Sequence, residues 1–191
     1  QCQNERSQFA NKDTAMSMLK SKLIELKERK DPGLILFSSG TTGEPKAALH
    51  DLKFLLNKFK KEGKRLSTVT FLLFDHIGGF NTMMYTLVNG GLMATLETRS
   101  ADEVCSLIEK YHLELLPTSP TFINLILLNG VYKKYDLSSL KMITYGTEPM
   151  PETTLQSIHK ILPNAKLKQT YGLSEVGIMP TKSENSESLW I

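Results

Sequence analysis

A polar stretch that carries two glycines directly follows a short apolar run near the start of the sequence. The apolar run is LILF, residues 34–37, and the stretch after it is SSGTTGEPK. Glycine adopts backbone angles that other residues avoid, so successive N–H groups in such a loop can converge on an anion. The serine and threonine hydroxyls are further donors, and Lys46 adds a flexible positive charge. This combination favours the binding of phosphate.

The spacing of these residues differs from that of the familiar nucleotide motif GxxxxGK[ST]. Gly40 and Gly43 are three residues apart, and Pro45 stands directly before Lys46. A helix therefore cannot start at the lysine in the way that this motif requires, which argues against a P-loop phosphotransferase. For this stretch taken alone, an ordinary Gly/Ser turn is the alternative.

A second polar stretch, QTYGLSEVG, occupies residues 169–177. Tyr171 offers a flat ring, Gly172 allows a tight turn, and Ser174 supplies a hydroxyl. The carboxylate of Glu175 suits Mg²⁺, which takes one or two protein oxygens together with phosphate and water. The alternative for this glutamate is a cap or a salt bridge on a surface turn.

Strands and helices must alternate along the chain to position these two stretches. Runs rich in apolar and β-branched residues predict strands at 34–37, 68–74, 91–97, 113–117, 140–146 and 165–172. Apolar residues at three- and four-residue steps predict helices at 14–29, 51–62, 78–89, 100–111, 119–129 and 151–162. Such alternation is typical of successive βαβ units, so we predict an α/β fold whose mainly parallel sheet has helices on both faces.

Polar loops follow four of the predicted strands, at residues 38–46, 75–79, 146–149 and 171–175. Ligands of open parallel sheets bind beyond the carboxyl ends of the strands. We therefore expect these four loops to meet at one edge of the sheet.

The composition is that of an ordinary soluble protein, with 40% hydrophobic and 23% charged residues among 191. The formal net charge of +3 does not favour nucleic acid as a partner. Lysines within residues 53–64 lie opposite apolar residues that have helical spacing, which indicates a solvated helix face. No apolar run approaches the ~20 residues that cross a bilayer, and no apolar signal segment starts the sequence.

Two cysteines, Cys2 and Cys105, are too few for a disulfide framework and lack the spacing of metal ligands. Cys105 falls on the apolar side of a predicted helix, which favours a buried thiol over a reactive one. A reducing cytoplasm is therefore the expected location.

Four motifs, taken in order, resemble those of the adenylate-forming superfamily, which includes acyl-CoA synthetases, aryl-CoA ligases, peptide-synthetase adenylation domains and luciferases. SSGTTGEPK is similar to its phosphate loop, and YGLSE to its Tyr-Gly-x-Thr-Glu motif, with Ser174 where Thr is usual. LFDHIGG resembles the aromatic or histidine motif beside the acyl site, and YGTEPM resembles the adenine-wall motif. The resemblance extends from residue 34 to about residue 177.

The resemblance implies how ATP and its metal would be bound. The β- and γ-phosphates would be bound by the phosphate loop, at Ser39, Gly40, Thr41, Thr42, Gly43 and Lys46. The adenine would be bordered by Thr147, Glu148 and Pro149, with Tyr171 stacked on its face and Gly172 as a further nucleotide-binding residue. Ser174 would contact the α-phosphate and Glu175 would hold Mg²⁺.

The resemblance also implies which residues take part in the chemistry. His76 would lie between the acyl carboxylate and the nucleotide, so the catalytic set would be Lys46, His76, Ser174 and Glu175. Phe80, Met83 and Met84 follow on the next predicted helix, where at least two of the three are expected to pack in the core rather than line the acyl pocket.

The activity implied is the ATP-dependent conversion of a carboxylic acid into an acyl-adenylate. The acyl group would then pass to a thiol, either that of CoA or that of phosphopantetheine on an acyl carrier protein. The sequence does not name the acid. The alternative is a non-catalytic nucleotide-binding or scaffolding module with the same fold.

The family pattern is longer than this sequence, which lacks the ribose-binding aspartate, the hinge and the second lysine of a C-terminal lid domain. We therefore expect residues 14–191 to be the central part of an AMP-binding domain, without the first lobe and the lid, and to be inactive alone. Residues 1–13 are polar and without pattern, so we expect them to be disordered.

Overall fold

The computed structural model of the chain describes residues 16–25, 32–39, 45–173 and 177–179. Residues 1–13, for which we expected disorder, lie outside these ranges, and so do parts of both polar stretches. Among the described residues, no helix has the length and apolar character that a membrane crossing requires.

The chain divides into two compact units, Gln1–Lys61 and Glu62–Ile191. In the first unit a helix spans residues 16–25. Strands β1 (Gly33–Ser39) and β2 (Pro45–Asp51) of the same unit pair along their whole length as an antiparallel hairpin.

This hairpin corrects two expectations. We expected residues 34–37 to open a series of βαβ units and residues 38–46 to form a loop. Instead, β1 pairs antiparallel with β2, and Lys46 lies on β2. The reason is the length of the connection, because only residues 40–44 join the strands, whereas a crossover to a parallel partner needs a dozen or more residues.

A short helix follows the hairpin, where we predicted one helix over residues 51–62. Helix α2 (Leu52–Asn57) tightens into a single 3-10 turn, η1 (Lys58–Lys60). The Asp51 carboxylate accepts a hydrogen bond of 3.1 Å from a backbone N–H of the first turn, which caps the helix. Leu55 and Phe59 are buried, as the apolar spacing predicted.

The second unit is built on a five-stranded parallel sheet in the order β4-β3-β5-β6-β7. This confirms the predicted α/β fold with a mainly parallel sheet. The strands are shorter than predicted, and in chain order they are β3 (Thr68–Val69), β4 (Met93–Ala94), β5 (Leu115–Thr118), β6 (Met142–Tyr145) and β7 (Lys166–Gln169).

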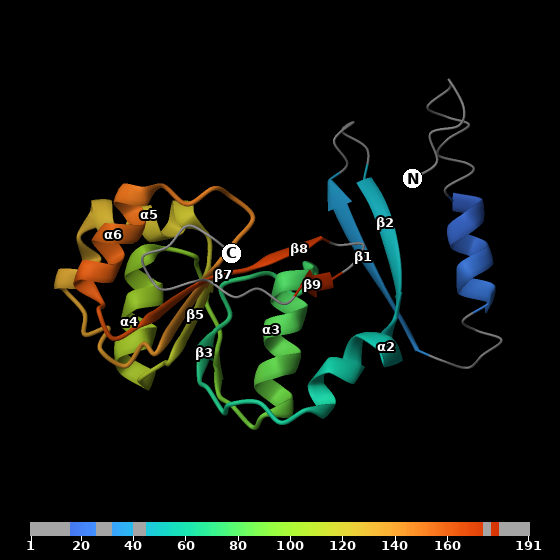
Figure 1. The fold of residues 1–191 in the computed structure, drawn as a ribbon, viewed down its shortest axis with the longest axis horizontal. Helices are drawn as coiled ribbons and strands as arrows, with labels where there is room; N and C mark the ends of the chain where they lie inside the picture. The colour runs from blue at the N-terminus through green and yellow to red at the C-terminus, as the bar shows by residue number, and fades with distance from the viewer. Residues whose placement is uncertain (1–15, 26–31, 40–44, 174–176, 180–191) are drawn as a thin grey trace, which may run out of the picture. The chain divides into compact units, whose positions relative to one another are not determined.

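Helices cover both faces of this sheet. Figure 1 shows α4, α5 and α6 on one side of the strands and α3 on the other. Ser100 and Ser119 cap the N-termini of α4 and α5, each accepting a backbone hydrogen bond with its hydroxyl oxygen. The helical segments are α3 (Ile77–Val88), α4 (Ala101–Tyr111), α5 (Pro120–Asn129), η2 (Val131–Lys133) and α6 (Glu152–Ile161).

The main core of the second unit lies between the sheet and helices α4, α5 and α6. It joins strand residues to the inner faces of the three helices, and its members include Leu116, Ile143, Leu167, Ile108, Ile123 and Ile158. Cys105 is part of this core, which confirms the predicted buried thiol.

A second hairpin follows the sheet, where we predicted one strand over residues 165–172. Strands β8 (Tyr171–Leu173) and β9 (Gly177–Met179) pair antiparallel and pack on α3 (Figure 1). Thr170 lies between β7 and β8, and its N–H and its hydroxyl both donate to the carbonyl oxygen of Tyr145, at 2.7 and 3.1 Å, so contact with the end of β6 continues to this residue.

Candidate functional site

The carboxyl ends of β5, β6 and β7 are level with one another. Thr118 pairs with Tyr145, and Tyr145 pairs with Gln169, so the last residues of the three strands stand side by side. The loops that follow these strands therefore leave the sheet at the same edge. This edge of the second unit is the candidate site.

The loop after β6 lies against the end of β7 without room for a side chain. A Cβ atom on Gly146 would stand 2.5 Å from the carbonyl oxygen of Thr170 and 2.8 Å from its hydroxyl. Both distances are shorter than a Cβ atom tolerates, so this position requires glycine. The loops after β6 and β7 are consequently in direct backbone contact.

Thr147 has a left-handed backbone conformation, with φ of 71°. This region is uncommon for a β-branched residue, and such strained residues persist where their surroundings hold them. Thr147 and Pro149 are both exposed, so the adenine-wall stretch presents these two residues outward at the edge of the sheet.

Glu148 is held by a residue of a neighbouring loop. Its Oε2 accepts a hydrogen bond of 3.2 Å from the backbone N–H of Thr121 and a second, short one from the hydroxyl of Thr121. Thr121 is the second residue of α5 and follows β5. The carboxylate therefore joins the loop after β6 to the start of α5.

Thr121 is a residue that the sequence analysis did not single out. The signal was present, because Thr121 follows a predicted strand, like the four loops that we expected at the edge. All four of those loops contain glycine, whereas residues 118–120, which follow the strand predicted at 113–117, do not. A polar residue after any parallel strand was the better criterion.

Thr118 and Tyr145 bring two buried hydroxyls to the ends of β5 and β6. Thr118 is 4% exposed, and its Oγ1 has no hydrogen-bond partner among the residues that the structure describes. Burial raises the pKa of the Tyr145 phenol, so this group stays neutral near pH 7.

Tyr171 leaves the sheet immediately after Thr170 and begins β8. Half of its surface is exposed, so its ring is available to another flat group. Gly172 pairs with Ile178 in the hairpin, and Leu173 pairs with Gly177. In the sequence, Ser174 and Glu175 fall between Leu173 and Gly177, and they lie outside the described residues.

His76 occupies the N-cap of α3, in the stretch that follows β3. Its Nδ1 accepts a hydrogen bond of 3.3 Å from the N–H of Gly78. In the neutral imidazole this bond leaves the proton on Nε2, which becomes a donor. The helix that carries His76 packs against β8 and β9, so this histidine and the Tyr171 motif belong to neighbouring elements.

The position of His76 depends on a close backbone contact. A Cβ atom on Gly79 would stand 1.8 Å from the carbonyl oxygen of Leu73, so the first turn of α3 lies directly on the preceding loop. The N–H of His76 also donates to this carbonyl, at 3.2 Å. Of the two glycines in DHIGG, the second, Gly79, is therefore required for this close packing.

The three residues considered for the acyl pocket differ in their surroundings. Phe80 is buried and Met84 is half-buried. Met83 lines a small apolar void of about 10 Å³ between α3 and the sheet, together with Gly79 and Pro117. Such a volume holds at most about one water molecule.

The phosphate-loop residues belong to the first unit. Ser38 pairs with Lys46 and Ser39 pairs with Pro45, so Ser39 and Lys46 stand at the same end of the β1–β2 hairpin. Gly40, Thr41, Thr42 and Gly43, which connect these ends, lie outside the described residues.

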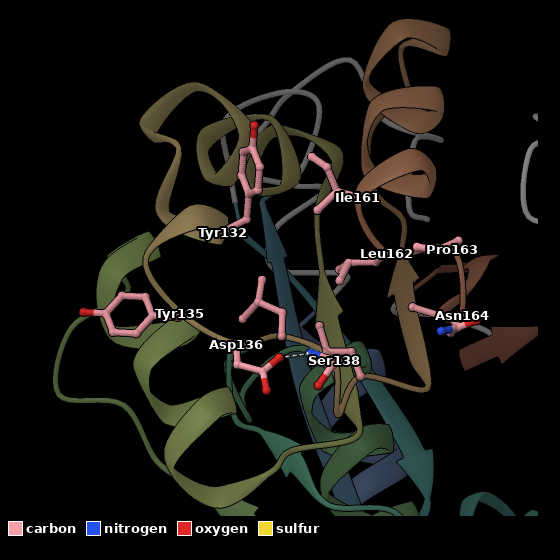
Figure 2. Close-up of a pocket in the computed structure, with 11 residues that line it drawn as sticks. Tyr132, Tyr135, Asp136, Ser138, Ile161, Leu162, Pro163 and Asn164 are labelled. Atoms are coloured by element: carbon pink, nitrogen blue, oxygen red, sulfur yellow. Dashed lines mark hydrogen bonds between the residues drawn. The ribbon is translucent and has the colours of Figure 1, made fainter.

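A separate pocket lies at the amino ends of β6 and β7. It measures about 240 Å³ and contains none of the predicted site residues. Figure 2 shows Tyr132 and Tyr135 beside it, and the Asp136 carboxylate accepting from the N–H of Ser138 at 2.9 Å. The pocket is thus separate from the carboxyl edge.

Known proteins resemble this chain in sequence. A family model described as AMP-binding enzyme matches residues 2–188. Probable CoA ligase CCL5 from Humulus lupulus is 30% identical over 157 residues, which are 77% of this chain and 28% of that protein. Acyl-CoA synthetase 7 from Caenorhabditis elegans is 28% identical over 174 residues, which are 83% of this chain and 32% of that protein. The chain thus spans about a third, or slightly less, of the length of these relatives.

Solved structures resemble the chain in fold. The luciferase-like enzyme from the mealworm Zophobas morio superposes with a TM-score of 0.67 and 27% identity, over 75% of this chain and 35% of that one. The N-terminal domain of FACL13 from Mycobacterium tuberculosis gives a TM-score of 0.67 at 22% identity, over 76% of this chain and 38% of that one, which supports the fold. Because the family model matches nearly the whole sequence, the chain belongs to the family of AMP-binding enzymes.

Proposed function

We propose that the chain is the nucleotide-binding part of a ligase that activates a carboxylic acid with ATP. The acid's carboxylate attacks the α-phosphorus, pyrophosphate leaves, and an acyl-adenylate forms. The sulfur of a thiol then attacks the acyl carbon, a thioester forms, and AMP leaves. The observation that carries this proposal is the level carboxyl edge of β5, β6 and β7, from which the adenine-wall and Tyr171 stretches both emerge.

The electrostatic task of this reaction explains the residue types. Two anions, the carboxylate and the triphosphate, must approach each other, and negative charge moves to the leaving pyrophosphate. Backbone N–H groups of the phosphate loop, at Ser39, Gly40, Thr41, Thr42 and Gly43, and the ammonium of Lys46 oppose that charge. No general base is needed, because the acid is already ionised near pH 7.

At the edge of the second unit, Tyr171 stacks on the adenine, while Thr147, Pro149 and Gly172 border it. The half-exposed ring of Tyr171 and the exposed residues of the adenine-wall stretch support this assignment. Ser174 contacts the α-phosphate. His76 donates from Nε2 toward the acyl carboxylate, which the hydrogen bond at its Nδ1 supports.

Mg²⁺ is the metal that accompanies the nucleotide. In the part of the chain that the structure describes, no three His, Cys, Asp or Glu residues form a metal-binding group. Mg²⁺ requires no such group, because it keeps water and substrate phosphates as most of its ligands, and the Glu175 carboxylate has the required donor chemistry. When bound, the ion neutralises phosphate charge.

The acceptor thiol is that of CoA, since the relatives named above are CoA ligases and acyl-CoA synthetases. The alternative acceptor is the thiol of phosphopantetheine on an acyl carrier protein. Because the chain spans 28% of CCL5, the complete activity belongs to a longer protein. A reducing cytoplasm is the proposed location, which the buried thiol of Cys105 supports.

Nucleotide titration of the 191-residue chain, followed by amide NMR shifts, tests this proposal. Mg·ATP should shift residues 39–46, 147–149 and 171–175, while AMP should shift the last two groups. Shifts confined to the lysines of α2 and η1 would indicate nonspecific charge binding and contradict the proposal. Glu175→Gln should weaken Mg·ATP binding and leave binding of metal-free AMP unchanged.

A further inference from the structure

We propose that Thr121 and Glu148 form a bridge that fixes the loop after β6 for adenine binding, so that Glu148 acts as a positioning residue and does not touch the nucleotide. This Thr121–Glu148 bridge consists of the two hydrogen bonds that Oε2 of Glu148 accepts from Thr121. The inference rests on the proposed function, because it concerns how the adenine side of that site is held.

The bridge accounts for the charge of Glu148. A free carboxylate beside a triphosphate would repel it, whereas here the acceptor oxygen is directed to the N-terminus of α5, where the helix dipole favours negative charge. Two donors from one residue engage the same oxygen, and one of them is a backbone N–H of the first turn. The Oε2 atom of Glu148 is therefore engaged by donors of the protein rather than directed to the ligand.

The bridge also accounts for the strained residue beside it. Thr147 has φ of 71° and lies between two fixed points, the contact of Gly146 with Thr170 and the bond of Glu148 to Thr121. A β-branched residue keeps this conformation only where its neighbours impose it. Loss of the bridge should therefore release Thr147 and Pro149, the two exposed residues that face outward at the edge.

Ser119 provides a matched control, because it caps the same helix without reaching the loop. Its hydroxyl oxygen accepts from the N–H of Phe122 at 3.3 Å. Ser119→Ala and Thr121→Val each remove one hydroxyl from the start of α5, yet only the second weakens the bridge. Thr121→Ser keeps the hydroxyl and should therefore keep the AMP affinity of the wild type.

The test measures dissociation constants of the 191-residue chain and its variants for AMP and for inorganic tripolyphosphate. Thr121→Val and Glu148→Ala should weaken AMP binding about tenfold, because a hydrogen bond to a charged group is lost from the support of the adenine side. Tripolyphosphate affinity should not change in any variant. Ser119→Ala and Thr121→Ser should bind AMP as the wild type does.

Equal losses of AMP affinity in Thr121→Val and Ser119→Ala would overturn the inference. A general destabilisation of α5 would then explain both losses without the bridge. Loss of tripolyphosphate affinity in step with AMP would overturn it too. If the wild type binds tripolyphosphate but not AMP, the proposed adenine site is wrong, and the role of the bridge in adenine binding is overturned with it.

Amide hydrogen exchange of the free chain then tests the bridge separately. Faster exchange at Thr147 and Met150 in Thr121→Val, but not in Ser119→Ala, supports the bridge. Unchanged exchange in both variants, or faster exchange in both, overturns it.

Discussion

Single glycines decide how closely the backbone segments around the candidate site approach each other. In DHIGG the two adjacent glycines have different surroundings. A Cβ atom on Gly79 would meet the backbone carbonyl of Leu73 at 1.8 Å, whereas one on Gly78 would meet the flexible end of the Leu72 side chain at 3.2 Å. The first contact cannot relax without moving the backbone, while the second can.

We predict that Gly79→Ala destabilises the chain by about 2–3 kcal/mol or displaces the first turn of α3, because overpacking against backbone has few ways to relax. Gly78→Ala is the matched control, and we expect its effect to stay below about 1 kcal/mol. Urea unfolding of both variants measures the difference. Equal stabilities would show that α3 does not lie on the Leu72–Leu73 backbone as described.

Cys105 has the surroundings of an inert thiol. It is fully buried, and burial raises its pKa to about 12, with the nearby Asp102 charge as a smaller cause. The thiolate is the reactive species, and at pH 7 it would be about one part in 10⁵ of this group. Chemistry that depends on a cysteine nucleophile is therefore not expected at this position.

We predict that Cys105 does not react with a thiol reagent such as DTNB in the folded chain and reacts completely in urea. The measurement uses a Cys2→Ser background, so that only one thiol is counted. Reaction of the native protein at the rate of the unfolded one would contradict the buried position of Cys105.

At the scale of elements, helices were easier to predict than strand partners. The structure confirms helices close to the predicted 78–89, 100–111, 119–129 and 151–162, because their spacing and their capping residues are local signals. Ser100 and Ser119, for instance, precede α4 and α5 and cap them.

Strand pairing is decided by distant residues, and there the sequence was less informative. The apolar run of β1 has the composition of a parallel strand, yet the five-residue connection forces an antiparallel partner. Likewise, the end of β7 is held against β6 by bonds from Thr170 to Tyr145, which is 25 residues away. The Thr121–Glu148 contact spans 27 residues and carries no local pattern.

One acidic residue joins three elements at the amino end of the sheet. Glu114 precedes β5, forms a short ion pair with Lys141 before β6, and accepts from the N–H of Ser67 before β3 at 3.1 Å. These interactions hold the pKa of Glu114 below its usual range, and the hydrogen bond from Lys141 is the largest cause. The carboxylate form is therefore favoured by folding.

We predict that Glu114→Gln lowers the free energy of unfolding at pH 7 by about 1 kcal/mol or less, since the pair is partly exposed and screened. A depressed folded-state pKa gives stability that is present above the unfolded value, near 4.3, and is lost as pH falls through the folded value. The gap between wild type and variant should thus narrow below pH 4. Urea unfolding at pH 7 and pH 3 measures it, and a gap that persists at pH 3 would contradict the assignment.

At the scale of the whole molecule, the chain carries the edge proposed to bind the nucleotide and spans about 30% of the length of the relatives named above. The adenylation reaction needs more than that edge. The acid and the α-phosphate must be held at reacting distance while water is excluded, and closure of a further domain commonly does this.

We predict that these 191 residues alone do not complete the reaction. In well-oriented systems, positioning accounts for about 7 to 11 kcal/mol of the barrier, so its loss lowers the rate by many powers of ten. The assay combines the purified chain with ATP, Mg²⁺, hydroxylamine and a panel of fatty, aryl and amino acids, and it detects hydroxamate, with a full-length CoA ligase as the positive control. We expect that the chain binds the nucleotide but forms no hydroxamate. Hydroxamate formed with any acid would mean that the catalytic site is complete within Gln1–Ile191, and that the role proposed here for a closing domain is wrong.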